Sequence, residues 1–244
     1  MGPDQPPAGA VDVAAVLRQG EMTVHGRIPG SSNATLLVTC ALGDHVQLGV
    51  YKPARGERPL WDFPNGLHRR EVAAYELSEA LGWGLVPVTV TRDEGPHGPG
   101  SVQRFVTEAV EGEHYFTLRD EERWWPDLKR LAAFDVVANN ADRKSGHVLL
   151  ADDRLWAIDH GLCFHPEPKL RTVIWDFATE ALATDILDDV RHLLARGVER
   201  LTAGLLDDDE QEALAWRAEA LVARGELPMP DDRGRWPPYP WPLV

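Results

Sequence analysis

The segment 139–161 constrains the fold of this chain more than any other. It contains "NNADRKSGHVLL", with Asp142, and ends at "DHG", which begins with Asp159. Between the two acidic points, "HVLLA" and "RLWAID" read as strands joined by the polar turn "DDR", which predicts a β-hairpin. Because a hairpin returns the chain to the end it left, Asp142 and Asp159 should be neighbours.

Two carboxylates gathered at one end of a hairpin repel each other unless a cation lies between them. A divalent metal with a phosphate would serve, and so would the side chains of Arg143 and Lys144. The simpler alternative is that Asp142 caps a turn and Asp159 pairs with a local arginine. The rest of the sequence has to decide between a site and two polar turns.

The pattern of the chain changes near residue 110. With 244 residues it can form one large domain or two lobes of roughly 100 residues each. Strand-like runs come first, and helix-like stretches follow. The strand-like runs are 22–28, 35–42, 45–53 and 101–110, with one helix at 67–81, and the later helices are 127–139, 181–196 and 208–224. This order predicts an α+β fold with a β-rich N-terminal lobe (11–108) and a mainly helical C-terminal lobe (109–244), after a disordered tail (1–10).

Charge and composition narrow the partners. The net charge of −14 repels phosphate backbones and anionic lipid surfaces, so we expect neither nucleic acid nor stable membrane association. No apolar run approaches the roughly 20 residues of a membrane-spanning helix, and the N-terminus does not resemble a secretory signal. Two cysteines, Cys40 and Cys163, cannot form a disulfide framework and favour a cytoplasmic location.

The N-terminal lobe offers a lysine and a glutamate of its own. In "HVQLGVYKP", Lys52 shares one strand face with the apolar residues Val46, Leu48 and Val50, and a lysine there needs an anion. On the helix 67–81, Glu71 lies at the border of the apolar arc and is the carboxylate best placed to meet it. Upstream, "GRIPGSSNAT" is a small polar turn with backbone N–H groups available to a phosphate.

In this order of features the sequence resembles the protein-kinase-like superfamily. The features are a polar turn, a strand lysine, a helix glutamate, an Asp turn, a hairpin and Asp-x-Gly. The resemblance is closest to the phosphatidylinositol 3-/4-kinase-like branch and an actinobacterial-type family within it. It covers roughly residues 20–200. The branch's Asp-Arg-His-x-x-Asn reads here from Asp142 to His147, and its Asp-x-Gly is Asp159-His160-Gly161.

The resemblance implies a two-lobed kinase-like fold and an ATP-dependent phosphotransferase. Asp142 would take or position the proton of the acceptor hydroxyl, with Lys144 beside it, and Asp159 would bind Mg²⁺ or Mn²⁺. For the nucleotide, Lys52 would hold phosphates and Glu71 would orient the lysine. The resemblance also implies that Ser31, Ser32 and Asn33 lie over the phosphates and that adenine contacts the backbone from Phe105 and Val106 to Glu108.

Two departures from the branch leave alternatives open. His147 stands where the branch has Asn as a metal ligand, and Lys144 stands where it has His. Imidazole suits Mn²⁺ or Zn²⁺ better than Mg²⁺, so the chain is either a kinase with a shifted metal preference or a pseudokinase. A nucleotide-responsive regulatory or scaffold protein and a nucleotidyl transferase remain alternatives on the same fold.

The acceptor and the tail are less constrained. Without a basic amphipathic helix, the chain suits a soluble protein or small-molecule acceptor better than a lipid. Lys169 and Arg171, after Asp-x-Gly, could meet an anionic substrate, although two basic residues are common on a surface. The Pro-rich C-terminus carries Trp236, Tyr239 and Trp241, which we expect to pack on the protein rather than bind a partner.

Overall fold

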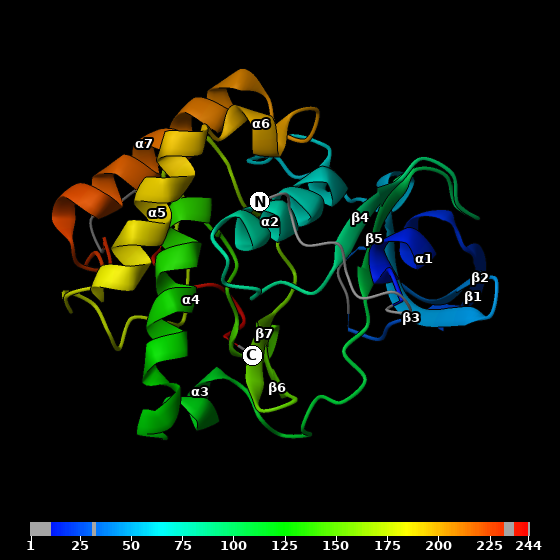
Figure 1. Ribbon diagram of the computed structural model, residues 1–244, viewed down its shortest axis with the longest axis horizontal. Coiled ribbons are helices and arrows are strands. Elements are labelled where there is room, and N and C mark those ends of the chain that lie inside the picture. The colour runs from blue at the N-terminus through cyan, green and yellow to red at the C-terminus, as the bar shows by residue number, and fades with distance from the viewer. Residues whose placement is uncertain (1–10, 31–32, 232–236, 244) are drawn as a thin grey trace, which may run out of the picture. The chain divides into compact units, whose positions relative to one another are not determined.

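The computed structural model describes residues 11–30, 33–231 and 237–243. The described chain forms two compact units, which are considered separately (Figure 1). The first contains the chain up to Arg58 together with Val88–Phe105, and the second contains Pro59–Pro87 together with the chain from Val106 onward. Contacts thus place the segment 59–87 with the helical unit, whereas the expected lobe boundaries follow the chain order and stay predictions.

The first unit is an antiparallel sheet of five strands with one helix packed on it. The strand order is β1-β2-β3-β5-β4, and the helix is α1 (Val13–Gln19). The strands are β1 (Glu21–Arg27), β2 (Leu36–Leu42), β3 (His45–Pro53), β4 (Thr89–Arg92) and β5 (Gly100–Arg104). Leu17 of α1 is fully buried among apolar residues of the sheet, including Val38 and Val102. The expected strand 101–110 is shorter than predicted, because the chain turns at Thr107 and Glu108.

The two faces of β3 differ from expectation. Val46, Leu48, Val50 and Lys52 do share a face, but Val46 is 67% exposed and the other three are half-buried. The buried face is that of Gly49 and Tyr51. A Cβ on Gly49 would lie 3.3 Å from the Leu17 side chain, so the glycine allows α1 to approach the sheet closely. Because α1 was not predicted, the wrong face of β3 was expected to be the buried one.

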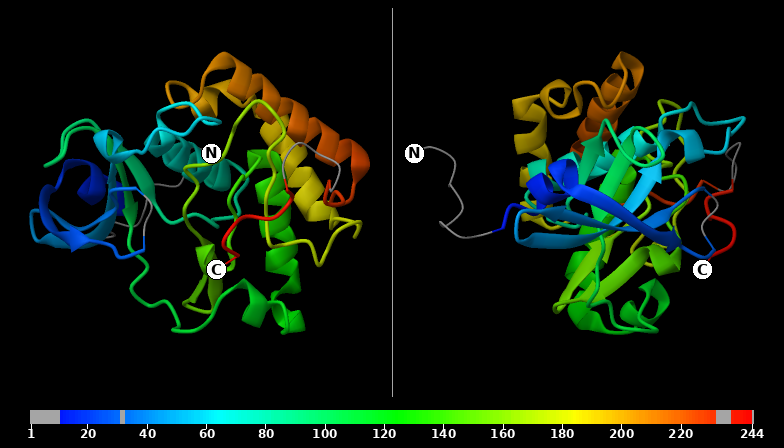
Figure 2. Two further views of the ribbon diagram at one scale, coloured as in Figure 1. Left: turned by 180° about the vertical axis from the view of Figure 1, so that it is seen from behind. Right: turned by 90° about the vertical axis from the view of Figure 1, so that its right-hand side faces the viewer.

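The second unit is mainly helical, with one small hairpin. Figures 1 and 2 show α4, α5 and α7 side by side, and their apolar faces share one core with residues of α2. The helices are α2 (Leu67–Ala80), α3 (Tyr115–Leu118), α4 (Trp125–Ala138), α5 (Thr184–Arg196), α6 (Glu199–Thr202) and α7 (Asp208–Arg224). The predictions of α2, α4, α5 and α7 are confirmed, while the two four-residue helices were too short to show a period.

Local sequence explains where the helices begin and end. Asp207 and Glu210 form a capping box at the start of α7, since each side chain accepts the other's backbone N–H at 2.9 and 3.0 Å. At the C-terminal end of α4, Asn139 adopts a left-handed conformation with φ of 51°. This conformation ends the helix and begins the loop that carries Asp142.

The predicted hairpin is confirmed. It consists of β6 (Val148–Ala151) and β7 (Arg154–Ala157), paired antiparallel. The two turn residues, Asp152 and Asp153, both have φ of 53°, which is the backbone that a tight two-residue hairpin loop requires. Asp tolerates this conformation better than most residues, so the "DD" sequence fixes the register of the pair.

The C-terminal segment 237–243 is fixed to the second unit by its backbone. The carbonyl of Pro238 accepts the N–H of Thr172 at 3.1 Å and Nε1 of Trp175 at 3.0 Å. Tyr239 is 45% exposed and Trp241 is 88% exposed. The expectation that Trp241 packs on the protein is therefore wrong, because carbonyl groups and not aromatic rings hold the segment. Trp236 lies outside the described residues.

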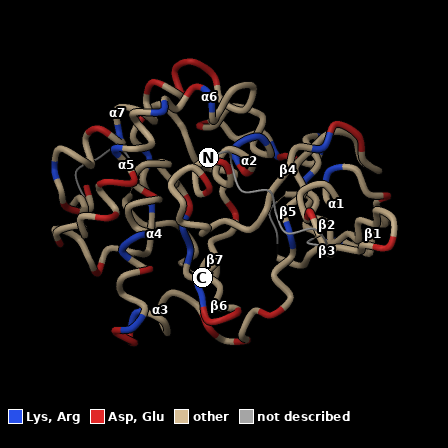
Figure 3. The backbone as a smooth tube through the Cα atoms, in the orientation of Figure 1, with Lys and Arg blue, Asp and Glu red and all other residues tan. Residues whose placement is uncertain are grey.

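In the described ranges, no helix has the length and apolar character needed to cross a membrane. Figure 3 shows acidic and basic residues scattered over both units, with an acidic stretch at the start of α7.

Candidate active site

The loop after α4 holds Asp142 in a fixed position. The side chain of Asn140 accepts the Asp142 N–H at 3.0 Å and donates to Asp135 of α4 at 3.0 Å. The Asp142 carboxylate lies 3.2 Å from Nζ of Lys144, and these side chains are 24% and 22% exposed. Asp142 is thus a largely buried carboxylate with a single close cation and an opening to solvent.

Arg143 joins the two acidic points through the interior of the unit. Its side chain is fully buried and forms a two-point ion pair with Asp135, with Nε and Nη2 at 2.9 and 2.8 Å from the carboxylate. The same guanidinium donates to the carbonyl of Ile158 at 3.0 Å and to Nε2 of His160 at 2.8 Å. Ile158 and His160 flank Asp159 in the sequence, so one side chain holds the backbone carbonyl before Asp159 and the imidazole of the residue after it.

Asp159 follows the hairpin and lies close to His147, which precedes it. Its φ of 61° lies in the left-handed region, and its side chain is 51% exposed. Nε2 of His147 lies 3.5 Å from the Asp159 carboxylate, and the His147 carbonyl accepts the Ile158 N–H at 3.0 Å. The hairpin therefore brings His147 and Asp159 together, as its geometry predicts.

The two carboxylates also act on each other. Burial raises the pKa of Asp142 to about 6; Lys144 opposes that rise, the charge of Asp159 adds to it and Arg171 lowers it again. Asp142 and Asp159 are thus close enough for their negative charges to repel each other, as the hairpin predicts. A carboxylate with a pKa near neutrality can both lose and accept a proton at physiological pH.

Glu71 has a partner that the sequence did not suggest. It is 2% exposed, and its Oε2 accepts the backbone N–H of His160 at 3.0 Å. A Cβ on Gly161 would lie 3.3 Å from Oε1 of Glu71, so glycine leaves room for the carboxylate against the Asp-x-Gly backbone. Glu71 belongs to the second unit and Lys52 to the first, and the pairing of the two stays a prediction.

The other residues predicted to contact the nucleotide lie in the first unit and at the beginning of the second unit's later segment, which starts at Val106. Asn33 accepts the Arg58 N–H at 3.0 Å through its side chain, which ties the polar turn to the chain after β3. Phe105 donates its N–H to Leu48 at 3.0 Å, directly after β5. Val106 is buried and Glu108 is exposed, while Ser31 and Ser32 lie outside the described residues.

The donor atoms present fit a divalent ion that is shared with phosphate. A separation of 3.5 Å lets Nε2 of His147 and the Asp159 carboxylate reach one ion with bonds of about 2 Å. In the part of the chain that the structure describes, no cluster of three or more His, Cys, Asp or Glu residues could hold a metal unaided. Mg²⁺ and Mn²⁺ sites in nucleotide enzymes commonly use one or two protein ligands and complete their shell with phosphate oxygens and water.

The sequence analysis missed the residues that support this site. The Asp135–Arg143 pair and the Glu71–His160 contact were not predicted. A signal for the first was present, because Asp135 interrupts the apolar side of the helix 127–139, and a buried carboxylate needs a cation. No comparable signal marks the backbone of His160 as the partner of Glu71.

The fold of the described chain is protein-kinase-like. Three similar solved structures are a hydra Fam20 with sugar, the Golgi casein kinase with Mn/ADP bound and the Helicobacter pylori proinflammatory kinase CtkA. Their TM-scores are 0.58, 0.57 and 0.53, and their identities to this chain are 15%, 15% and 12%. They cover 87%, 86% and 86% of this chain and 86%, 74% and 94% of their own, which establishes the α+β kinase-like fold.

Among curated proteins, the chain is 40% identical over 268 residues to Protein Rv2133c of Mycobacterium tuberculosis (strain ATCC 25618 / H37Rv). The match spans 95% of each protein, so the chain belongs to the family of Rv2133c. No family model matches the sequence.

Loss of the buried partner of Arg143 should destabilise the second unit. Asp135→Asn leaves a fully buried guanidinium without a counter-charge, which costs about 3–5 kcal/mol in comparable cases. We expect the free energy of unfolding in urea to fall by that amount. The control is Asp188→Asn, which removes the partner of Arg191 in an ion pair whose side chains are 51% and 49% exposed. It should cost less than about 1 kcal/mol. Equal losses in the two variants would contradict the role assigned to Asp135.

The raised pKa of Asp142 predicts a pH-dependent cost to stability. Because the folded state holds this proton up to about pH 6, stability falls as the pH rises from about 4 through 6. Asp142→Asn removes the buried charge and should stabilise the protein at pH 8 by about 1–3 kcal/mol, with little gain at pH 4. Thermal or urea unfolding at both pH values measures this. The exposed turn variant Asp152→Asn should change stability by no more than about 0.5 kcal/mol, and a gain at pH 8 no larger than this control would refute the prediction.

Proposed function

We propose that the chain is an ATP-dependent phosphotransferase, an atypical kinase, that acts on a hydroxyl of a soluble protein or small molecule. The observation that carries the proposal is the loop in which Asp142, Lys144, His147 and Asp159 meet, braced from within by Arg143. Such a loop combines a candidate base, a cation and two metal-ligand atoms, which is the set that phosphoryl transfer requires.

Asp142 has the role of accepting or positioning the proton of the acceptor hydroxyl. With a pKa of about 6 its carboxylate is mainly ionised at neutral pH and still basic enough to take up a proton. Lys144, 3.2 Å from it, is placed to offset negative charge on the transferred phosphoryl group. Asp142 would thus handle the proton, and Lys144, two positions later, would stabilise the negative charge of the phosphoryl group.

We propose that Asp159 and His147 bind Mg²⁺ or Mn²⁺ together with the nucleotide phosphates. The ion supplies neutralisation of the phosphate charge when it is bound. The Golgi casein kinase with Mn/ADP bound, which shares the fold, supports the use of a nucleotide and a divalent ion. The choice between the two metals depends on His147, since an imidazole favours the softer ion.

The remaining nucleotide contacts rest on the resemblance to kinases. We propose that Lys52 binds phosphate and that Glu71 orients it, in addition to holding the Asp-x-Gly backbone. The polar turn residues Ser31, Ser32 and Asn33 would cover the phosphates, and the backbone of Phe105, Val106 and Glu108 would contact adenine. Membership of the phosphatidylinositol 3-/4-kinase-like branch and a cytoplasmic location stay predictions.

One observation favours a second candidate, a pseudokinase or nucleotide-responsive regulatory protein. Nδ1 of His147 accepts the Lys144 N–H at 3.4 Å, which leaves the ring proton on Nε2, facing Asp159. In this tautomer Nε2 of His147 carries a proton on the side of Asp159 and offers no lone pair to a metal. The site would then bind a nucleotide weakly, or not at all, without transferring phosphate.

The first test is the thermal stability of the purified protein with ATP in Mg²⁺, in Mn²⁺ and without metal. At about a hundredfold excess of ATP over the dissociation constant, a metal-dependent rise in Tm of about 5–10 °C is expected. Asp159→Asn should abolish the rise, since asparagine keeps the left-handed backbone and removes the charge. Asp153→Asn, at φ of 53° and 87% side-chain exposure, is the matched control and should keep the rise. No shift under any condition would exclude ATP as the ligand.

Transfer is then followed with ATP labelled at the γ or the α phosphate. Label retained from the γ position indicates kinase chemistry, and label from the α position indicates nucleotidyl transfer. Metal-dependent ATP binding with neither transfer supports the regulatory alternative.

The metal preference tests His147 directly. His147→Asn restores the amide that the kinase-like branch carries and should raise Mg²⁺-supported ATP binding relative to Mn²⁺ by about tenfold, because an amide oxygen is a harder ligand. The ratio of dissociation constants, measured by calorimetry in the two metals, reports this. An unchanged ratio would mean that His147 is not a ligand, and the hydrogen-bonded tautomer would then describe its role.

A further inference from the structure

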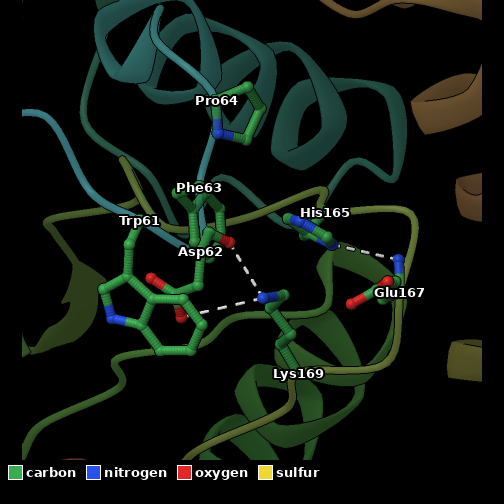
Figure 4. A pocket seen from close by; sticks show the side chains of 7 residues that line it. All are labelled: Trp61, Asp62, Phe63, Pro64, His165, Glu167 and Lys169. Carbon is green, nitrogen blue, oxygen red and sulfur yellow. Dashed lines mark hydrogen bonds and ion pairs between the residues drawn. The ribbon is translucent and has the colours of Figure 1, made fainter.

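A second concave region of the second unit lies beside the candidate active site. It is a cavity of about 420 Å³ between the segment that precedes α2 and the segment that follows Asp-x-Gly (Figure 4). The first segment contributes Trp61, Asp62 and Phe63, and the second contributes His165, Glu167 and Lys169. We refer to it as the Trp61–Glu167 cavity. No role in the proposed phosphotransfer has been assigned to these residues.

The wall of this cavity is fastened to the loop of Asp142. The side chain of Asn139 donates to the carbonyls of His165 and Glu167, both at 2.8 Å, and accepts the Lys169 N–H at 2.9 Å. Arg171 lies 3.8 Å from Asp62, and its charge also lowers the pKa of Asp142. Arg171 therefore interacts with a residue of the cavity and with Asp142, so the cavity lies on the same side of the unit as the candidate base.

The basic side chains in and next to the cavity are already paired with Asp62. Nζ of Lys169 lies 2.8 Å from the carbonyl of Asp62 and 3.7 Å from its carboxylate, and the Lys169 side chain is 2% exposed (Figure 4). The Arg171 side chain is 20% exposed and faces the same carboxylate. Lys169 and Arg171 are therefore less available to an anionic substrate than the sequence suggests, because both lie against the Asp62 carboxylate and the Lys169 side chain is buried.

The cavity residues that are most exposed to solvent are aromatic and acidic, not basic. Trp61 is 78% exposed and Glu167 is exposed. Burial and the nearby charge of Lys169 lower the pKa of His165, so its ring adds no positive charge at neutral pH. An exposed indole and an exposed carboxylate that line one cavity can attract an ammonium or guanidinium group, through the ring quadrupole and through charge.

We propose that the Trp61–Glu167 cavity binds a cationic group, an ammonium or a guanidinium, on the acceptor. Trp61 covers the cation with its ring, and Glu167 supplies the counter-charge. The cation comes either from a basic side chain of a protein acceptor or from a free amine. That the bound molecule is the acceptor rests on the proposed phosphotransferase function, whereas binding of the cation does not.

Calorimetric titration of the full chain tests the site with three probes. They are an amidated hexapeptide with one serine and two arginines, the same peptide with both arginines replaced by glutamate, and spermidine. We expect the arginine peptide or spermidine to bind and the glutamate peptide not to bind. Binding of the peptide alone indicates a protein acceptor, and equal binding of spermidine indicates a free amine. Binding of the glutamate peptide as tightly as the arginine peptide would overturn the proposal.

Two variants locate the site. Trp61→Ala and Glu167→Gln should each raise the dissociation constant of the bound probe by about tenfold, which matches a partly desolvated cation–π or charge contact. The controls are Trp216→Ala and Glu212→Gln, which remove the same groups from the exposed face of α7 and should leave binding unchanged. Equal weakening by the control variants would assign the binding to general charge attraction and refute the site.

The thermal shift with ATP and metal, measured on the same proteins, separates this inference from the proposed function. A normal ATP shift without binding of any cationic probe refutes the cation site alone. Binding of the arginine peptide without an ATP shift keeps the cation site and refutes the phosphotransferase.

Discussion

The buried ion pair between Asp135 and Arg143 determines the geometry of the candidate site. Both side chains are fully buried, and removing two charges from water costs several kcal/mol that their attraction offsets only in good geometry. The fork of Arg143 meets that requirement, because its remaining donors reach Ile158 and His160. A hydrophobic pair would fill the same space but could not hold the Ile158 carbonyl and the His160 imidazole on either side of Asp159. The pair therefore contributes position more than stability.

The segment from Asn139 to Arg143 also holds the chain that lines the Trp61–Glu167 cavity. Arg143 exchanges backbone hydrogen bonds with Arg171 and Val173 at 3.0 and 3.1 Å, and Asn139 holds the segment between His165 and Lys169. A shift at the Asp135–Arg143 pair would therefore move the candidate base and the acceptor cavity together. Such coupling suits a protein that must align a hydroxyl with a nucleotide, because a misplacement of about 1 Å is costly in group transfer.

The sequence predicted the elements whose signals are local. The hairpin followed from alternating strands around "DDR", and α2, α4, α5 and α7 followed from their apolar periods. It did not predict α1, whose seven residues are too few for a clear period, and the exposed and buried faces of β3 were exchanged as a result. Residues of the candidate site were predicted because their spacing along the chain is characteristic. Their supports, Asp135 and the partner of Glu71, depend on tertiary packing, which no local pattern records.

Lys144 gives the departure from the kinase-like pattern a physical meaning. Burial and the charge of Asp159 both raise the pKa of Asp142, which favours the protonated form of the carboxyl group. The ammonium of Lys144, 3.2 Å away, works against that rise. A neutral histidine at this position would not supply the same charge. Because a protonated carboxyl group cannot accept a proton from a hydroxyl, Lys144 would help keep Asp142 in the form that the proposed phosphotransfer needs.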